Sequence, residues 1–388
     1  MKLARVQDSC KPRDEVLQER LNIEALFMAN FGEVIEKRGH EIYKNAKQFF
    51  DVTYPTENLK RICTDVFTQL SPDNASGGSV KLSTGFGGGK SHALIALWHL
   101  ANSFRDPNIG GDILDPSIRT FDVRVAAMDL SRAGGLNLYE RTNGPTTRTL
   151  WGELAYRLAG DAGYKLFEEE DTKWGKPTAD KLEKLIGSVP TLILLDEIPT
   201  YLAALEPMGE GKADALLSFF QMLTQVVSSC PRSVLVWTEP SGMSAFASQT
   251  HRVGQAASSA TGISITEIGR RLSQVSDPIG EEFEAVILKR LFKKIDEGAR
   301  RKAQQAYAEM AQRAKEADPN LFQHPNPQQF AEKVGRCYPI SPALFESARA
   351  LATVPKFNSS RGAMRLFTKI LRQVWAQDRQ DDIALVGP

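Results

Sequence analysis

The sequence lacks the features that define several large classes of protein. It has only four cysteines in 388 residues, and they lie dozens of residues apart, without a CxxC pair and without a histidine at ligand spacing. This pattern argues against a disulfide framework and against a zinc site. We therefore expect reduced structural thiols at Cys10, Cys63, Cys230 and Cys337.

Long hydrophobic runs are also missing. The longest candidates are a few residues around Leu192 to Leu195, far short of the ~18 residues that span a bilayer. The opening residues, MKLARVQDSCKPRDE, lack the apolar stretch of a secretion signal. We therefore expect a cytoplasmic protein without a membrane partner.

Neither sign of charge is in excess. Lys and Arg total 48 and Asp and Glu total 47, so the net charge is +1. The total charge gives no indication of a nucleic-acid or anionic-membrane partner. It does not exclude a local basic patch. Apolar residues make up 42% and charged residues 24%, which is typical of globular proteins, and the length predicts two or three domains.

Periodicity and chain breakers divide the chain into three parts. Residues 1–50 are predicted to be an N-terminal helical segment, because apolar residues recur at helical spacing over 13–50. From about Glu281 the pattern changes to helices alone, which predicts a helical lid domain over 281–388. The strand-like ending DIALV has no downstream partner, which suggests the front part of a longer protein.

Residues 51–280 alternate strands with helices. Strands are predicted around residues 80–82, 121–130, 191–195 and 234–238. Helices are predicted over 59–70, 90–104, 150–158 and 213–227. This alternation favours the α/β class, with a doubly wound parallel sheet.

The strongest motif lies between the first of these strands and the helix after it. Residues 83–91 read STGFGGGKS and match GxxxxGK[ST], except that Thr84 replaces the first glycine. The glycines let backbone N–H groups converge on phosphate oxygens at the positive end of the helix. Lys90 would contact the terminal phosphates and Ser91 would offer its hydroxyl to Mg²⁺. The alternative is a glycine-rich turn that ends in GKS by chance.

The residues expected to bind the nucleotide are those of the loop and of the first helical turn. They are Thr84, Gly85, Phe86, Gly87, Gly88, Gly89, Lys90, Ser91 and His92. For His92 and for His99, both on the helix itself, packing or exposure is the simpler interpretation.

An acidic pair supplies a second anchor for a magnesium nucleotide. Four apolar residues, LILL, lead directly into Asp196 and Glu197, and a strand carries such residues to the edge of the sheet where α/β proteins bind ligands. Asp196 would hold the metal and Glu197 would accept a proton from the attacking water. Such pairs also occur as simple helix N-caps, and Pro199 does mark the start of a new element.

The spacing of the two motifs favours hydrolysis of ATP. Asp196 lies 106 residues after Lys90, and the predicted strand at 121–130 falls between them. That added strand, with a glutamate directly after the aspartate, resembles the additional-strand, catalytic-glutamate division of phosphate-loop ATPases. Small-molecule kinases usually lack this glutamate, so hydrolysis is favoured over phosphoryl transfer.

Further candidate residues have open alternatives. Thr238 or Glu239 ends the strand after the acidic one, where a polar residue would sense the γ-phosphate, although an ordinary polar strand end fits equally well. Arg270 and Arg271 are candidate arginine fingers toward a neighbouring subunit or a solvated pair, and Arg365 is a candidate lid arginine or a surface residue. A run of basic residues near the start of the helical part is a candidate DNA contact or, more simply, a solvated helix face. It consists of Lys289, Arg290, Lys293, Lys294 and Arg300 to Lys302.

Several phrases, taken in order, resemble one known family. They are FFDVTYPTENL, STGFGGGKSHALIALWHL, TLWGELAYRL, LILLDEIPTYL, CYPISPAL and SSRGAMRLF. They resemble the AAA+-like phosphate-loop ATPases of domain-of-unknown-function family 499, which are large bacterial proteins of phage-defence loci, including the phage-growth-limitation (Pgl) and BREX systems. The likeness covers roughly residues 49–375, and FGGGKSH is its most specific part.

The resemblance implies ATP and Mg²⁺ as cofactors and an antiviral assembly that contains a methyltransferase or a helicase. It also implies that Lys90, Ser91, Asp196 and Glu197 act as proposed above, with Arg365 as the lid arginine. Thr53 and Pro55 would lie near the adenine. DNA is a candidate partner and a homo-oligomer a candidate assembly. The leading hypothesis is an ATPase that works as a motor or switch, and the rivals are a non-hydrolysing scaffold and a DNA translocase or helicase subunit.

Overall fold

The computed structural model describes residues 3–18, 26–84, 89–103, 106, 108–118, 121–131, 137–209, 211–240, 274–276, 282–318, 326–351, 359–376 and 383–387. The chain forms two compact units. Residues 29–51 and 55–280 make up the α/β unit, and residues 1–28, 52–54 and 281–388 make up the helical unit. Residues 1–50, predicted as one segment, are thus divided between the two units.

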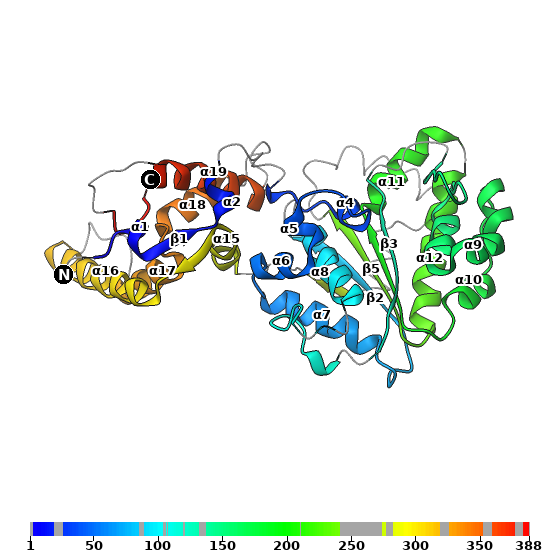
Figure 1. Ribbon diagram of the computed structural model, residues 1–388, viewed down its shortest axis with the longest axis horizontal. Coiled ribbons are helices and arrows are strands. Elements are labelled where there is room, and N and C mark those ends of the chain that lie inside the picture. The colour runs from blue at the N-terminus through cyan, green and yellow to red at the C-terminus, as the bar shows by residue number, and fades with distance from the viewer. Residues whose placement is uncertain are drawn as a thin grey trace. The chain divides into compact units, whose positions relative to one another are not determined.

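A five-stranded parallel sheet forms the centre of the α/β unit (Figure 1). Its strand order is β3-β4-β5-β2-β6, and every pairing between neighbours is parallel. The strands are β2 (Gly78–Thr84), β3 (Arg124–Asp129), β4 (Thr191–Asp196), β5 (Ser233–Pro240) and β6 (Gln274–Ser276). The first four coincide with the predicted strands, which confirms an α/β protein with a parallel sheet, whereas β6 was not predicted.

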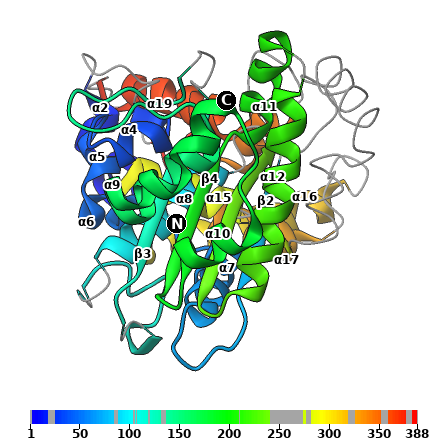
Figure 2. The ribbon, with the colours of Figure 1, turned by 90° about the vertical axis from the view of Figure 1, so that its right-hand side faces the viewer.

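Helices cover both faces of the sheet because successive side chains of a strand point to opposite faces. In β4, Ile193 and Leu195 belong to one buried cluster, while Leu192 and Leu194 belong to another. The first cluster packs under α9 (Leu150–Lys173), α10 (Ala179–Ile186), α11 (Ile198–Leu205) and α12 (Lys212–Ser229), the helices nearest the viewer in Figure 2. The second packs under α4 (Phe31–Ile35), α7 (Glu57–Gln69) and α8 (Lys90–Asn102).

The burial of β4 on both faces of the sheet explains the uninterrupted apolar run LILL in its sequence. All six of its residues are buried, as expected for a central strand of a parallel sheet that is covered on both faces.

Threonine is the N-cap residue of several of the covering helices. Thr56, Thr149 and Thr178 accept hydrogen bonds from backbone N–H groups at the starts of α7, α9 and α10.

The helical segment predicted over residues 13–50 is a series of short helices among the described residues. They are α2 (Asp14–Leu17), α4, α5 (Glu41–Lys44) and α6 (Ala46–Val52). Lys37 and Gly39 adopt left-handed φ values of 56° and 82°, which end the helical path after α4. The apolar periodicity was real, but it belongs to several short elements.

The helical unit joins the beginning of the chain to its end. It contains α1 (Val6–Ser9), β1 (Cys10–Pro12), α2, α15 (Phe283–Leu291), β7 (Phe292–Ile295), α16 (Glu297–Ala317), α17 (Pro327–Cys337), α18 (Pro342–Leu351) and α19 (Ser359–Ala376). Strand β1 pairs with β7 in antiparallel fashion. Residues 292–295, predicted as helix, are therefore a strand, because they meet a partner from the distant N-terminus. The terminal strand-like segment also has a partner, since Val386 bridges to Ile340.

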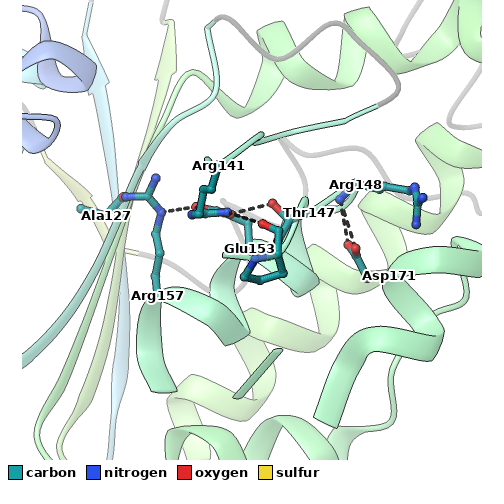
Figure 3. Close-up of polar contacts among 8 residues, drawn as sticks. Ala127, Arg141, Thr147, Arg148, Glu153, Arg157 and Asp171 are labelled. Carbon is teal, nitrogen blue, oxygen red and sulfur yellow. Dashed lines mark hydrogen bonds and ion pairs between the residues drawn. The ribbon is translucent and has the colours of Figure 1, made fainter. Parts of the chain in front are cut away.

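A buried ionic network fixes the segment that leads from β3 toward α9 (Figure 3). The Glu153 carboxylate is fully buried and pairs with Arg141 and Arg157 at 2.5 Å each, and it accepts a hydrogen bond from Thr147 at 2.7 Å. Arg157 also donates to the Ala127 carbonyl of β3 at 2.7 Å. These bonds hold residues 137–149 against the end of the sheet near Asp129.

Candidate functional site

The carboxyl ends of the parallel strands meet at one edge of the sheet, and the candidate site lies there. Strand β2 ends at Thr84 and α8 begins at Lys90, so Ser91 lies in the first turn of α8. Gly89 caps this helix with a left-handed φ of 84°, a conformation that favours glycine. Of the expected loop, Gly85, Phe86, Gly87 and Gly88 lie outside the described residues.

Asp196, at the end of β4, meets hydroxyl groups from two other elements. Its side chain is 3% exposed. Thr238 of β5 donates a hydrogen bond to Oδ1 of Asp196 at 2.5 Å. The Ser91 hydroxyl also lies close enough to this carboxylate to lower its pKa. Ser91 and Asp196, 105 positions apart in sequence, thus lie close together.

Burial raises the pKa of the Asp196 carboxyl to about 6. The hydrogen bond from Thr238 opposes this rise, the negative charges of Glu197 and Asp129 add to it, and the nearby Ser91 hydroxyl opposes it. The edge therefore brings three mutually repelling carboxylates together, with Asp196 buried and Asp129 and Glu197 half-buried. A divalent cation would relieve this repulsion.

Glu197 occupies a strained backbone position. Its φ of 60° and ψ of 38° lie in the left-handed region, which costs a residue with a side chain about 1–2 kcal/mol. Its N–H donates to Thr238 Oγ1 at 3.1 Å, and its carboxylate accepts from the Thr200 hydroxyl at 2.8 Å. Although Glu197 precedes α11, its side chain makes no capping hydrogen bond. The simple N-cap interpretation of the acidic pair therefore does not describe this residue.

Asp129 is a third acid at this edge that sequence reasoning missed. It ends β3 and is the register partner of Asp196. Its carboxylate accepts hydrogen bonds from the N–H groups of Gly32 at 3.2 Å and Ser131 at 2.9 Å. The available signal was the aspartate at the end of the predicted strand FDVRVAAMDL, in the same position relative to its strand as Asp196.

The two histidines of α8 pack against aromatic rings. The ring of His92 lies 4.5 Å from that of Phe49, centroid to centroid, and the ring of His99 lies 5.3 Å from the Phe49 ring. His99 is buried, and its Nε2 donates to the Tyr43 carbonyl at 2.7 Å. The packing interpretation of both histidines agrees with these contacts.

The remaining predicted residues are distributed over both units. Pro55 immediately precedes the N-cap of α7, whereas Thr53 is buried and belongs to the helical unit, as does Arg365 on α19. Arg270 and Arg271 lie outside the described residues.

The prediction that Arg290 contributes to a solvated or DNA-binding face is wrong. Its side chain is 5% exposed and donates to the Leu26 carbonyl at 2.7 Å.

The donors at the sheet edge suit Mg²⁺. They are carboxylate and hydroxyl oxygens, the ligands that this hard cation prefers. Within the described ranges, no group of three or more His, Cys, Asp and Glu side chains is arranged to hold a metal by itself. Mg²⁺ at nucleotide sites commonly takes only one or two protein ligands and completes its shell with water and phosphate. The residues present therefore fit a metal that arrives with a nucleotide.

The fold and this edge define a class: parallel α/β proteins with a polar, acidic site at the carboxyl ends of the strands. Within that class, the chain belongs to the DUF499 family, whose N-terminal domain matches residues 1–133 and 135–252. Residues 284–387 match the second domain of the BREX System ATPase PglY protein. The predicted resemblance to the DUF499 and BREX/Pgl phage-defence proteins is thus confirmed.

Comparisons with curated proteins and with solved structures gave no match. Among the described helices, none is both long and apolar enough to cross a membrane.

Proposed function

We propose that the protein binds ATP with Mg²⁺ at the edge formed by β2, β4 and β5 and hydrolyses it. The observation that carries this proposal is that Ser91, which follows the GK of the loop motif, lies close to the buried Asp196 at the carboxyl ends of the strands. Two sequence motifs that would share one metal ion in an ATPase converge on one place. The match to a domain of the PglY ATPase supports the same conclusion.

Each residue then has a distinct task. The backbone N–H groups from Thr84 to Gly89 and the start of α8 would surround the phosphates, and Lys90 would neutralise the terminal ones. Ser91 and Asp196 would hold Mg²⁺, which when bound screens the charge of the phosphate oxygens. His92 supports this turn through its contact with Phe49.

Glu197 is the proposed general base. Because its carboxylate lies directly after Asp196 and is oriented by the Thr200 hydroxyl, it can accept a proton from a water beside the γ-phosphate. Its left-handed backbone is the kind of strain found where a side chain must be aimed at a reaction. Thr238 donates to the Asp196 carboxylate and accepts from the Glu197 backbone N–H, so it would position both residues.

The strand order supports assignment to the additional-strand division of the doubly wound phosphate-loop NTPases, the AAA+-like group. Strand β5 lies between β2, which leads to the loop, and β4, which carries the acids. The strand that intervenes in sequence, β3, lies at the edge of the sheet instead. In this proposal the helical unit acts as a lid that supplies Arg365, and Thr53 and Pro55 contact the adenine.

We also propose that the protein works as a motor or switch together with protein partners, of which a methyltransferase or a helicase is the proposed kind. The match to a defence-system ATPase supports this role.

ATP turnover by the purified protein tests the proposal, with Lys90→Ala and Glu197→Gln as variants. We expect Lys90→Ala to weaken nucleotide binding, and Glu197→Gln to retain binding while turnover falls at least a hundredfold. Exposed residues of α9 provide matched controls, Lys165→Ala and Glu168→Gln, which should behave as wild type.

The outcomes separate the rival functions. Nucleotide binding without any turnover in the wild-type protein would exclude hydrolysis and favour the non-hydrolysing scaffold. Turnover that rises strongly with DNA would favour the translocase. Binding and turnover unaffected by Lys90→Ala would refute the proposed site.

A further inference from the structure

A group of exposed cations lies in the helical unit. We call it the basic ribbon: Lys11 of β1, Lys293 and Lys294 of β7, and Arg301 and Lys302 of α16. All five side chains are exposed. Residues 293–302 alone carry five basic and two acidic side chains, in a protein whose total net charge is only +1.

The pairing of β1 with β7 places like charges opposite one another. Lys11 and Lys294 are register partners in this antiparallel ribbon, and Lys293 is next in sequence. Like charges directly opposite on neighbouring strands destabilise a sheet. The fold therefore keeps a repulsive pair at a place where a neutral residue would serve stability better.

Nearby acids do not neutralise the ribbon. Asp296 Oδ1 accepts from the Ala299 N–H and caps α16, while Glu297 pairs with Arg300 at 3.0 Å. Within the described part of the chain, none of the five ribbon cations has an acidic partner within ion-pair distance.

We propose that the basic ribbon binds the phosphate backbone of double-stranded DNA. Duplex DNA carries about one negative charge per 1.7 Å of axis, and lysine and arginine contacts to it release counterions whatever the base sequence. A polyanion of this kind removes the repulsion between Lys11 and Lys294. Contacts to the phosphate backbone carry no base information, so the proposed binding is independent of sequence.

The composition of the surface favours DNA over a membrane. Peripheral membrane segments combine basic residues with apolar side chains that enter the lipid. The large hydrophobic residues exposed in the described structure are Met28, Leu166, Val189, Met310 and Leu351, and none belongs to β1, β7 or the first turns of α16. Without an apolar anchor, the ribbon is suited to a polyanion in water.

The test is the affinity of the full chain for a fluorescent duplex of two helical turns, measured by anisotropy from about 50 to 200 mM salt. If all five cations contact phosphate, the plot of log K against log salt has a slope of about −4.5. In the triple variant Lys11→Gln, Lys293→Gln, Lys294→Gln, the slope becomes shallower by about 2.7. Arg301→Gln with Lys302→Gln provides a second, independent reduction, of about 1.8.

The matched control removes three exposed cations of the same unit that lie outside the ribbon, by Arg313→Gln, Arg336→Gln and Lys369→Gln. It should keep the wild-type slope. No binding by the wild type, or an equal loss in both triple variants, would overturn the proposal. So would binding to phosphatidylserine-rich vesicles that depends on the ribbon while DNA binding does not. DNA is measured without nucleotide, so the result does not depend on whether the protein hydrolyses ATP.

Discussion

Thr238 connects the two acids of the candidate site through a single hydroxyl. The hydroxyl donates to Asp196 and accepts from the N–H of Glu197, and the side chain is 1% exposed. A hydroxyl is suited to this position because it can donate and accept at once. Sequence reasoning gave Thr238 and Glu239 as equal candidates at this strand end. The observed hydrogen bonds distinguish Thr238 as the residue that positions both acids.

Replacing Thr238 with valine keeps the shape of the side chain and removes both bonds. We expect the midpoint of thermal unfolding to fall by several degrees, because leaving buried polar groups unsatisfied costs about 1–3 kcal/mol. We also expect ATP turnover to fall more than tenfold while nucleotide binding changes less, since the acids lose their orientation. Thr238→Ser, which retains the hydroxyl, should recover most of the turnover. Equal turnover in the valine and serine variants would contradict this role.

His99 makes the stability of the α/β unit depend on pH. Burial lowers its pKa below the ordinary value, against the smaller opposing effect of its hydrogen bond to the Tyr43 carbonyl. The folded protein therefore binds fewer protons at His99 than the unfolded chain does, so stability falls as the pH drops below about 6.5. Thermal unfolding at pH 7.5 and 5.5 measures this loss. His99→Gln should make the difference between the two pH values smaller, and an unchanged difference would contradict the assignment to His99.

At the scale of elements, the sequence predicted those whose signals are local. The buried run of β4, the alternation of strands and helices, and the loop motif before α8 all lie within short windows, so residues 191–196 and 90–102 were anticipated closely. The serine, lysine and acidic residues of the candidate site were found for the same reason. Asp129 was missed because its importance comes from register with Asp196, which only the paired sheet reveals.

A glycine divides α9 into two parts. Gly160 has a φ of 59° and a ψ of −147°, a conformation that is essentially restricted to glycine, while no atom lies within 4 Å of the place where a Cβ would stand. Gly160→Ala should therefore destabilise the protein by about 1–3 kcal/mol through the backbone alone, visible as a lower unfolding midpoint.

Gly175, just beyond α9, is the matched control for this substitution. An added Cβ there meets only Glu170 atoms at 3.8 Å and 3.9 Å, and its φ is not in the left-handed region. Gly175→Ala should leave the unfolding midpoint unchanged or raise it slightly, because alanine restricts the unfolded chain. If both alanines lowered the midpoint equally, the conformational argument for Gly160 would fail.

At the scale of the whole molecule, the helical unit is discontinuous in sequence. Its first and last parts are joined by β1–β7 pairing and by hydrogen bonds to α19 and the terminal segment. Gln7 donates to the Val374 carbonyl at 2.8 Å, and Arg372 donates to the Val16 carbonyl at 2.8 Å. The sequence could not predict these contacts, because no local pattern indicates which distant segment a three-residue strand or a one-turn helix will join.

This discontinuity predicts that damage near the N-terminus will be felt near the C-terminus. Val16 of α2 is fully buried, and α2 packs on α19. Val16→Ala should cost about 2 kcal/mol, which raises the population of the open state of this unit more than tenfold. Hydrogen exchange read by mass spectrometry should therefore accelerate in α19 and β7, more than 250 residues away in sequence. Exchange in β4 and α8 should stay unchanged.

The reciprocal substitution completes this test. Val66 of α7 is equally buried but belongs to the α/β unit. Val66→Ala should accelerate exchange in α7 and its neighbour α8, leaving α19 and β7 as in wild type, because stability is lost first where the packing is removed. Acceleration of α8 by Val16→Ala, or of α19 by Val66→Ala, would show that the two units open together. Opposite patterns from two equal substitutions would establish that residues 3–17 stabilise the helical unit, although the α/β unit follows them in the chain.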